Sequence, residues 1–385
     1  MAAPIARNVV TLGVAQTLAW GSTYYLPAIL ANAMARDVGT GTPFVFAAFS
    51  GGLLASALLA PLAGRLIDRV GGKWVLAASN LVFALGLVQL GHAGDSISLL
   101  AGWLLLGIGM SGGLYEAAFS TLAGIYGSAA RRPVTGITLI AGFASTVCWP
   151  LSAWMEARYG WRDTCLVWAA VHVLVALPLN LSLPGAAHRR EPGKEAEKPA
   201  DVPHKAALMA GLSFVFAATW FCSTAMAAHL PRLLQEAGAT LPAAVAAASL
   251  VGPAQVAARV LEFWLMRQAH PVVSARAAAL AHPIGAAGLL ALGAPFAPFF
   301  TFAHGAGNGV MTIASGTLPL QYFGPGGYGL RQGLLMIPAR LVQAGAPFAF
   351  DLVLSRYGPT ALVLTACVSV LSFCVLMLLP RSRAG

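Results

Sequence analysis

One guanidinium lies in the middle of an apolar stretch of the sequence. The segment MIPARLVQAGAPF, residues 336–348, contains Arg340 as its charged residue. A charge without a partner at the depth of a bilayer costs about 2.5 kcal/mol or more. We therefore expect Arg340 either to form an ion pair inside the protein or to face a polar or anionic species.

A carboxylate in another apolar stretch, Glu116, is a candidate partner because the two residues lie at nearly matching depths. Two interpretations stay open. In the first, Glu116 and Arg340 form a structural ion pair that avoids two uncompensated charges. In the second, Arg340 binds an anionic substrate and Glu116 carries a proton, since burial disfavours its charged form. Both hold if binding of substrate or proton exchanges the partners.

Other polar and aromatic side chains recur at intervals of four, which places them on one face of a helix. The sets are Gln16, Trp20 and Tyr24; Gly112, Glu116 and Ser120; Trp220 and Thr224; and His304, Asn308 and Thr312. The last set is the most informative, because three polar groups facing lipid would each lack a hydrogen bond. For each aromatic residue alone, packing in a helix core remains an alternative.

The composition indicates the class of protein that carries these residues. Hydrophobic residues make up 58% of the chain and charged residues 9%, whereas soluble domains carry about 25% charged residues. Apolar runs of bilayer length, about 20 residues each, predict an all-α membrane protein with twelve transmembrane helices. Their predicted limits are 8–33, 43–66, 73–92, 97–126, 131–157, 162–183, 206–233, 241–267, 271–293, 296–323, 328–355 and 358–380.

The net charge of +10 follows from membrane topology and requires no nucleic-acid partner. Most of the 23 Lys and Arg residues fall on the side of the predicted N-terminus, and such an excess marks the cytoplasmic face. Both termini are therefore expected in the cytoplasm. The five cysteines lie in apolar runs without metal-ligand spacing, so we expect small core residues and no metal site. They are Cys148, Cys165, Cys222, Cys367 and Cys374.

The chain contains two copies of one unit. Tyr126-Gly127 and Gly136 recur as Phe323-Gly324 and Gly333 at an offset of 197, and ARYGW at 157–161 recurs as SRYGP at 355–359. The polar segment 188–205 separates the copies and has the composition of a solvated linker. We predict two six-helix bundles, 1–187 and 206–385, joined by this cytoplasmic linker, in a transporter-like duplication.

A short motif between the second and third runs resembles the signature of the major facilitator superfamily. The segment GRLIDRVGGK, residues 64–73, places Gly64, Asp68, Arg69, Gly71 and Lys73 as the family has them and departs from it at Gly72. The resemblance implies two pseudo-symmetric bundles and a conformational latch formed by these residues. Gly64 allows close helix approach, and Asp68 can accept hydrogen bonds from a helix N-terminus. The second copy keeps Arg259 and Glu262.

The resemblance also implies which residues bind the substrate, because in this family the first, fourth, seventh and tenth helices line the cavity. A weaker similarity to the oxalate/formate and monocarboxylate branch concerns Arg259 and Arg340, in the eighth and eleventh runs, and YGWR at 159–162. Arg259 also aligns with Arg65, so an anchor at the cytoplasmic edge remains an alternative for it. The expected substrate-binding residues are Arg340, Glu116, His304, Asn308, Trp20, Tyr24, Trp220 and Arg259.

We therefore expect a multi-pass transporter of the bacterial inner membrane that moves a small organic solute, preferably a carboxylate, by alternating access with proton coupling through Glu116. A monomer without cofactor is expected. The nucleotide-binding pattern GxxxxGK[ST] is absent from the sequence, so ATP is not the direct energy source.

The sequence also bears on two alternatives to a carboxylate transporter. A proton-coupled efflux pump for drugs or other toxic compounds is the alternative, although Cys148 to Ser152 in the fifth run lacks the glycines typical of such antiporters. A membrane enzyme would need a catalytic constellation. The histidines at 172, 229, 282 and 304 instead lie on different runs, so an enzyme is not expected.

Overall fold

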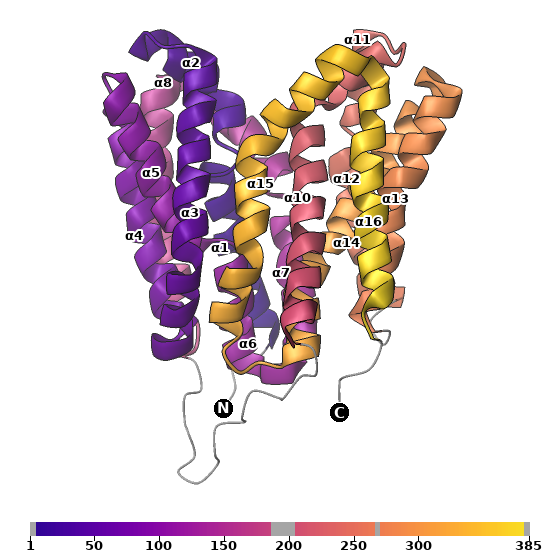
Figure 1. Cartoon of the computed structure of the whole chain (residues 1–385). Coiled ribbons are helices and arrows are strands. Elements are labelled where there is room, and N and C mark those ends of the chain that lie inside the picture. The colour runs from indigo at the N-terminus through magenta and orange to yellow at the C-terminus, as the bar shows by residue number, and fades with distance from the viewer. Residues whose placement is uncertain (1–4, 186–204, 266–269, 381–385) are drawn as a thin grey trace. The chain divides into compact units, whose positions relative to one another are not determined.

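The computed structural model describes residues 5–185, 205–265 and 270–380, and every regular element in these ranges is helical (Figure 1). The helices up to residue 185 are α1 (Ile5–Ser22), α2 (Pro27–Val38), α3 (Thr42–Val70), α4 (Gly72–Gly91), α5 (Ser96–Gly113), α6 (Tyr115–Tyr126), η1 (Gly127–Ala130), α7 (Arg131–Ala141), α8 (Ala144–Val171), η2 (His172–Ala176) and α9 (Leu177–Leu181). The later ones are α10 (Lys205–Glu236), α11 (Leu241–Ala248), α12 (Val251–Leu265), α13 (Pro271–Leu292), η3 (Ala294–Phe296), α14 (Ala297–Phe323), α15 (Tyr328–Tyr357), η4 (Gly358–Ala361) and α16 (Leu362–Leu378). The predicted linker 188–205, apart from Lys205, lies outside the described residues.

The all-helical prediction is confirmed, and helices cover each of the predicted apolar runs. Within the described ranges, seven helical stretches are long and apolar enough to cross a membrane. Three of them, Ser96–Leu181, Pro242–Leu265 and Tyr328–Leu378, contain more than one helix. The number of twelve spans therefore stays a prediction.

Several runs predicted as continuous helices are interrupted. The first divides into α1 and α2, and Pro27 begins the second piece. The fourth divides at Leu114, whose backbone is extended (φ −97°, ψ −166°) after Gly112 and Gly113. The fifth and eighth also divide, between α7 and α8 and between α11 and α12. Such breaks are tolerated at membrane depth where surrounding protein satisfies the freed backbone groups.

Contacts between residues divide the chain into two compact units. Unit 1 comprises Met1–Ala200 and Phe323–Leu334, and unit 2 comprises Asp201–Tyr322 and Leu335–Gly385. In unit 1, α5 packs against α3 and α4, and α1 packs against α7 and α8 (Figure 1). In unit 2, α16 packs against α13 and α10. The start of α15 thus belongs to unit 1, and the predicted bundle limits remain a prediction.

The repeated glycines have matching backbones in the two copies. Gly127 and Gly324 end α6 and α14 with φ of 57° and 70°, and Gly160 and Gly358 have φ of 83° and 56°. Such positive φ values are favourable for glycine and costly for other residues. The duplicated glycines therefore share a backbone conformation that other residues rarely adopt.

The side-chain cores of the units are apolar, and their outer faces are apolar too. Large residues such as Phe83 and Trp103 in unit 1, and Phe216 and Phe300 in unit 2, are fully buried, whereas many leucines are exposed. Exposed apolar side chains suit a lipid-facing surface. The expectation that all cysteines are core residues is wrong for two of them. Cys367 and Cys374 are exposed on α16, on its outward-facing side, while Cys148, Cys165 and Cys222 are buried.

Candidate functional site

The guanidinium of Arg340 is held inside unit 2. Arg340 lies in α15 and is 2% exposed. Its Nη1 donates a hydrogen bond of 2.9 Å to Oε1 of Gln343, one turn further along the same helix. The guanidinium carbon also lies 5.6 Å from the ring centroid of Trp220 in α10, a cation–π distance. The side chain is therefore buried within the protein, as the sequence predicted.

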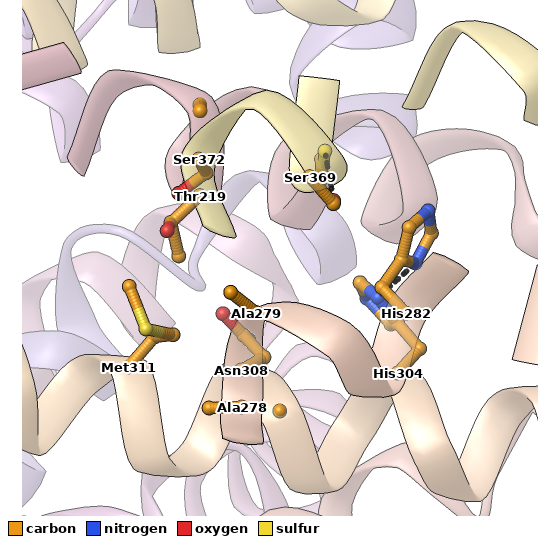
Figure 2. A pocket seen from close by; sticks show the side chains of 12 residues that line it. Thr219, Ala278, Ala279, His282, His304, Asn308, Met311, Ser369 and Ser372 are labelled. Carbon is orange, nitrogen blue, oxygen red and sulfur yellow. Dashed lines mark hydrogen bonds between the residues drawn. The ribbon is translucent and has the colours of Figure 1, made fainter. Parts of the chain in front are cut away.

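The predicted set on the tenth run forms one face of α14, next to two cavities. His304 and Asn308 line a pocket of about 380 Å³ between α10, α13, α14 and α16 (Figure 2). Asn308 and Thr312 line a second space of about 210 Å³, together with Trp220. Both cavities lie within unit 2. The three residues thus line cavities along α14, and their role in substrate binding stays a prediction.

Two histidines that the sequence left on separate runs are partners. Nδ1 of His282 in α13 lies 3.0 Å from Nδ1 of His304 in α14, and Nε2 of His282 lies 2.9 Å from Oγ1 of Thr365 in α16. All three side chains are buried. Figure 2 shows the two rings side by side at one end of the pocket. Sequence spacing within one run could not show this pair, because the two histidines lie on different helices and His282 also contacts Thr365 on a third.

Unit 1 contains a second histidine network, which the sequence analysis also missed. The π-helical segment η2 carries His172, which is fully buried; its Nδ1 lies 2.9 Å from Oδ1 of Asn80 and its Nε2 lies 2.7 Å from Oγ of Ser22. The amide nitrogen of Asn80 donates to the carbonyl of Leu76, which leaves Oδ1 as the acceptor. Nδ1 of His172 therefore donates to Asn80, while the Ser22 hydroxyl lies 2.7 Å both from Nε2 of His172 and from the carbonyl of Leu18. Both ring nitrogens thus have a polar neighbour within hydrogen-bond distance.

The predicted set on the fourth run is only partly correct. The break at Leu114 puts Gly112 at the end of α5 and Glu116 in the first turn of α6, so these two do not share a helix face. Gly112 instead packs closely against Ser79 and Val75 of α4. Glu116 and Ser120 remain together, because the Ser120 hydroxyl donates to the Glu116 carbonyl at 2.6 Å.

The predicted set on the first run is also interrupted, yet its aromatic members stay together in unit 1. Tyr24 lies beyond the end of α1, but its ring centroid is 5.1 Å from that of Trp20. Trp20 also lies 5.0 Å from Tyr115 and 5.9 Å from Tyr25, whose ring contacts Trp149. The amide of Gln16 donates to the carbonyl of Gly113 at 2.8 Å. These aromatic rings form one cluster across α1, α6 and α8.

The motif at 64–73 holds the start of α15 within unit 1. The carboxylate of Asp68 accepts hydrogen bonds of 2.9 Å from the backbone N–H groups of Gly329 and Leu330, in the first turn of that helix. A Cβ on Gly64 would collide with the carbonyl of Gly329. The predicted bonding of Asp68 to a helix N-terminus is thus confirmed, and its role as a latch stays a prediction.

The other motif residues are placed differently. Arg69 is exposed, and Nζ of Lys73 lies 5.4 Å from the ring centroid of Trp74. Gly71 ends α3 with φ 90° and ψ 145°. At the departure from the family pattern, a Cβ on Gly72 would collide with the side chain of Thr121. Close packing against α6 therefore explains why an arginine is absent there.

Arg259 and Arg65, which occupy equivalent positions in the two copies, have different surroundings. Arg259 is 4% exposed, and its Nε donates to the carbonyl of Gly309 at 3.3 Å. Its Nη2 lies 3.4 Å from Oε1 of Gln255. Arg65, with which it aligns, is exposed. Arg259 is thus a buried residue that ties α12 to α14, and both roles expected for it, substrate binding and an anchor at the cytoplasmic edge, stay predictions.

Comparison with known proteins supplies the family. The family model of the Major Facilitator Superfamily matches residues 12–299, well over half of the chain. The chain belongs to the Major Facilitator Superfamily. This confirms the resemblance that the motif at 64–73 suggested, and it makes the protein a transporter by family.

Two curated relatives are similar to short parts of this superfamily member. One is the MFS-type transporter pigP of Monascus ruber, 38% identical over 92 residues, which are 24% of this chain and 16% of that protein. The other is the MFS-type transporter calB of Penicillium decumbens, 34% identical over 110 residues, 28% of this chain and 19% of that protein. The chain thus spans less than a fifth of either relative, and both come from fungi.

Solved structures of the superfamily share the fold over the whole chain. The proton:xylose symporter XylE has a TM-score of 0.77 at 11% identity, covering 98% of this chain and 96% of that one. The transporter FucP in the outward conformation has a TM-score of 0.76 at 16% identity, covering 98% and 99%. The human organic anion transporter MFSD10 has a TM-score of 0.71 at 16% identity, covering 97% and 100%. At these identities the likeness concerns the fold alone.

Proposed function

We propose that this chain is a proton-coupled secondary transporter that moves a small organic carboxylate by alternating access through twelve spans. The observation that carries the proposal is the buried guanidinium of Arg340, set against Trp220 and next to a cavity-lining helix. A planar guanidinium matches the two oxygens of a carboxylate. Placed in an apolar helix, such a group is a functional site by default in a membrane protein.

Proton coupling is assigned to Glu116 in this proposal. Glu116 is partly buried in the first turn of α6, close to the aromatic cluster around Tyr115. A carboxyl group in such surroundings can exchange a proton during the transport cycle. Glu116 belongs to unit 1 and Arg340 to unit 2.

The latch is assigned to the motif residues. Binding of the Asp68 carboxylate to the N-terminus of α15 supports a role in holding one conformation, since the carboxylate interacts favourably with the helix dipole. Release of these bonds would then accompany the rocking of the repeats that alternating access requires. In this proposal the carrier is a monomer of the bacterial inner membrane. Both of its termini lie in the cytoplasm.

Uptake into proteoliposomes tests the proposal. The purified full chain is reconstituted, and labelled formate, acetate, propionate and oxalate are offered with and without an imposed pH gradient. The expected result is saturable uptake of at least one anion that the gradient accelerates. The Glu116→Gln variant should exchange substrate but lose the response to the gradient. Failure to move any anion in either direction would remove the carboxylate assignment.

Export of drugs or other toxic compounds is the second candidate, and the aromatic cluster of unit 1 is the observation in its favour. In this cluster the ring centroids of contacting pairs lie within 6 Å of each other. Trp20 contacts Tyr24, Tyr25 and Tyr115, and Tyr25 contacts Trp149. Aromatic faces attract organic cations. Movement of cationic dyes by the same proteoliposomes, without movement of carboxylates, would favour this function.

A further inference from the structure

The pocket between α10, α13, α14 and α16 is polar but carries no formal charge among the described residues that line it. Its polar side chains come from four helices, and Figure 2 shows Thr219, Asn308, Ser369 and Ser372 around the space, with the two histidines at its end. An uncharged polar surface offers hydrogen bonds to neutral groups and gives a bare anion no counter-charge. This pocket therefore suits neutral hydrogen-bonding groups, whereas Arg340 suits an anion.

The hydrogen bonds around His282 determine what His304 presents to the pocket. The hydroxyl of Thr365 donates to the carbonyl of Leu362 at 3.0 Å, so its oxygen accepts the bond from Nε2 of His282. Nδ1 of His282 is then the acceptor for N–H from Nδ1 of His304. This assignment satisfies every group. It leaves Nε2 of His304, which has no hydrogen bond within the described residues, as an acceptor at the pocket wall.

The remaining walls supply both donors and acceptors. The Oγ of Ser372 is buried and has no hydrogen-bond partner among the described residues, and its side chain is only 3% exposed. The hydroxyl of Thr219 donates to the carbonyl of Val215 and leaves its oxygen as an acceptor. Asn308 adds an amide with both functions. Hydroxyl groups, which donate and accept at once, complement such walls.

This pocket adjoins the surroundings of Arg340 within unit 2. Thr219, Asn308 and Met311 line both the pocket and the second space of about 210 Å³. Trp220 lines that second space and lies under the guanidinium of Arg340 at 5.6 Å. The two cavities thus share part of their lining, and one of them includes the ring that lies under the Arg340 guanidinium.

We infer that the substrate is a carboxylate that carries hydroxyl groups on its carbon chain. Its carboxylate binds Arg340, and its hydroxyls bind Asn308, Ser372 and Nε2 of His304. The inference rests on the proposed function, since it names the class of carboxylate. An unsubstituted fatty carboxylate would leave the polar walls without partners, at a cost comparable to unmade hydrogen bonds.

Three probes of similar length separate the two halves of the inference. Gluconate has a carboxylate and hydroxyls, hexanoate has the carboxylate alone, and glucitol has the hydroxyls alone. Calorimetric titration of the full chain in detergent should show gluconate binding at least about tenfold more tightly than either other probe, as one or two lost hydrogen bonds to a charged or polar group imply.

Variants locate the effect. Ser372→Ala and Asn308→Leu should each weaken gluconate binding about three- to tenfold and leave hexanoate binding unchanged. Ser111→Ala is the matched control, because the Ser111 hydroxyl bonds only to its own helix at the carbonyl of Ile108 in unit 1. Elution of each variant as a single species on size-exclusion chromatography excludes misfolding as the cause.

The outcomes distinguish the inference from the proposed function. Equal binding of hexanoate and gluconate, unaffected by Asn308→Leu, overturns the inference and leaves the carboxylate function intact. Equal binding of glucitol and gluconate overturns the proposed function and the inference with it. Binding of none of the three probes also overturns the inference, whereas tight gluconate binding that both variants weaken supports it.

Discussion

Each unit buries a histidine network, and the two networks differ in what they leave available. In unit 1, both nitrogens of His172 are bonded, to Asn80 and Ser22. In unit 2, the chain from Thr365 through His282 to His304 ends at a pocket. The first network fastens α1, α4 and η2 together, whereas the second fastens three helices and still presents an acceptor to a ligand.

The difference shows how a duplicated fold can divide its tasks. The two copies keep glycines with positive φ at equivalent positions, namely Gly127 and Gly324, and Gly160 and Gly358. Their polar interiors have diverged, with a closed network in one unit and a buried cation beside polar cavities in the other. We expect variants of the His172 network to change stability, and variants of Arg340 and of the pocket around His304 to change substrate binding.

The largest expected effect comes from Arg340. Arg340→Gln should reduce carboxylate uptake by at least about tenfold, because a bond to a charged group contributes about 1.5–3 kcal/mol. Protein yield and thermal stability should stay near those of the natural chain. If Arg340→Gln instead abolishes folding and Glu116→Gln restores it, the structural ion pair replaces substrate binding in the account.

The two histidine networks should respond oppositely. His172→Leu leaves Asn80 and Ser22 buried without their partner, which costs about 1–3 kcal/mol for each unsatisfied group. Its melting temperature in detergent should fall clearly. His304→Gln keeps an amide that can donate to Nδ1 of His282, so it should lose less stability than His172→Leu but bind substrate more weakly. Equal losses of stability in both variants would contradict the contrast between the units.

A smaller effect is expected at the start of α15. Asp68→Ala removes the acceptor for two backbone N–H groups at a helix N-terminus, a loss of about 1–2 kcal/mol. Arg69→Ala, the matched neighbour with an exposed side chain, should change stability by at most about 0.5 kcal/mol. Chemical unfolding of the two variants compares them, and a larger effect of Arg69→Ala would argue against the capping role.

The smallest effect concerns the loop end of α2. Hydrogen bonds from Trp161 and Arg162 hold the pKa of Asp37 below its ordinary value of 3.8. A lowered pKa in the folded state means that these bonds stabilise above that value and are lost as pH falls through the folded pKa. Lowering the pH from 5 to 3 should therefore reduce the melting temperature slightly in the natural chain and less in Asp37→Asn. An equal decrease in both proteins would show that Asp37 does not contribute to the pH dependence of stability.

The sequence predicted the features that depend on composition, periodicity and local motif. Helices at the apolar runs, the polar face from His304 to Thr312 and the bonding of Asp68 to a helix N-terminus all follow from such local patterns. The breaks at Leu114 and after Ser22 were missed, because tolerance of an interrupted helix depends on which neighbours satisfy its backbone.

Hydrogen bonds between side chains on different helices also could not be predicted from the sequence. The pairing of His282 with His304, and of His172 with Asn80, joins residues that are 22 and 92 positions apart. Each histidine alone is compatible with a packed core, a ligand role or a catalytic role. Only the packing of α13 against α14 and of α4 against η2 brings the partners within hydrogen-bond distance.

The central claim is that Arg340 recognises a carboxylate, and one titration tests it most directly. Propionate and propionamide have the same shape, but only propionate carries a charge. Calorimetric titration of the purified full chain should show propionate binding at least about tenfold more tightly than propionamide, a preference that Arg340→Gln removes. Equal binding of the two by the natural chain, or an unchanged preference in Arg340→Gln, would contradict the claim.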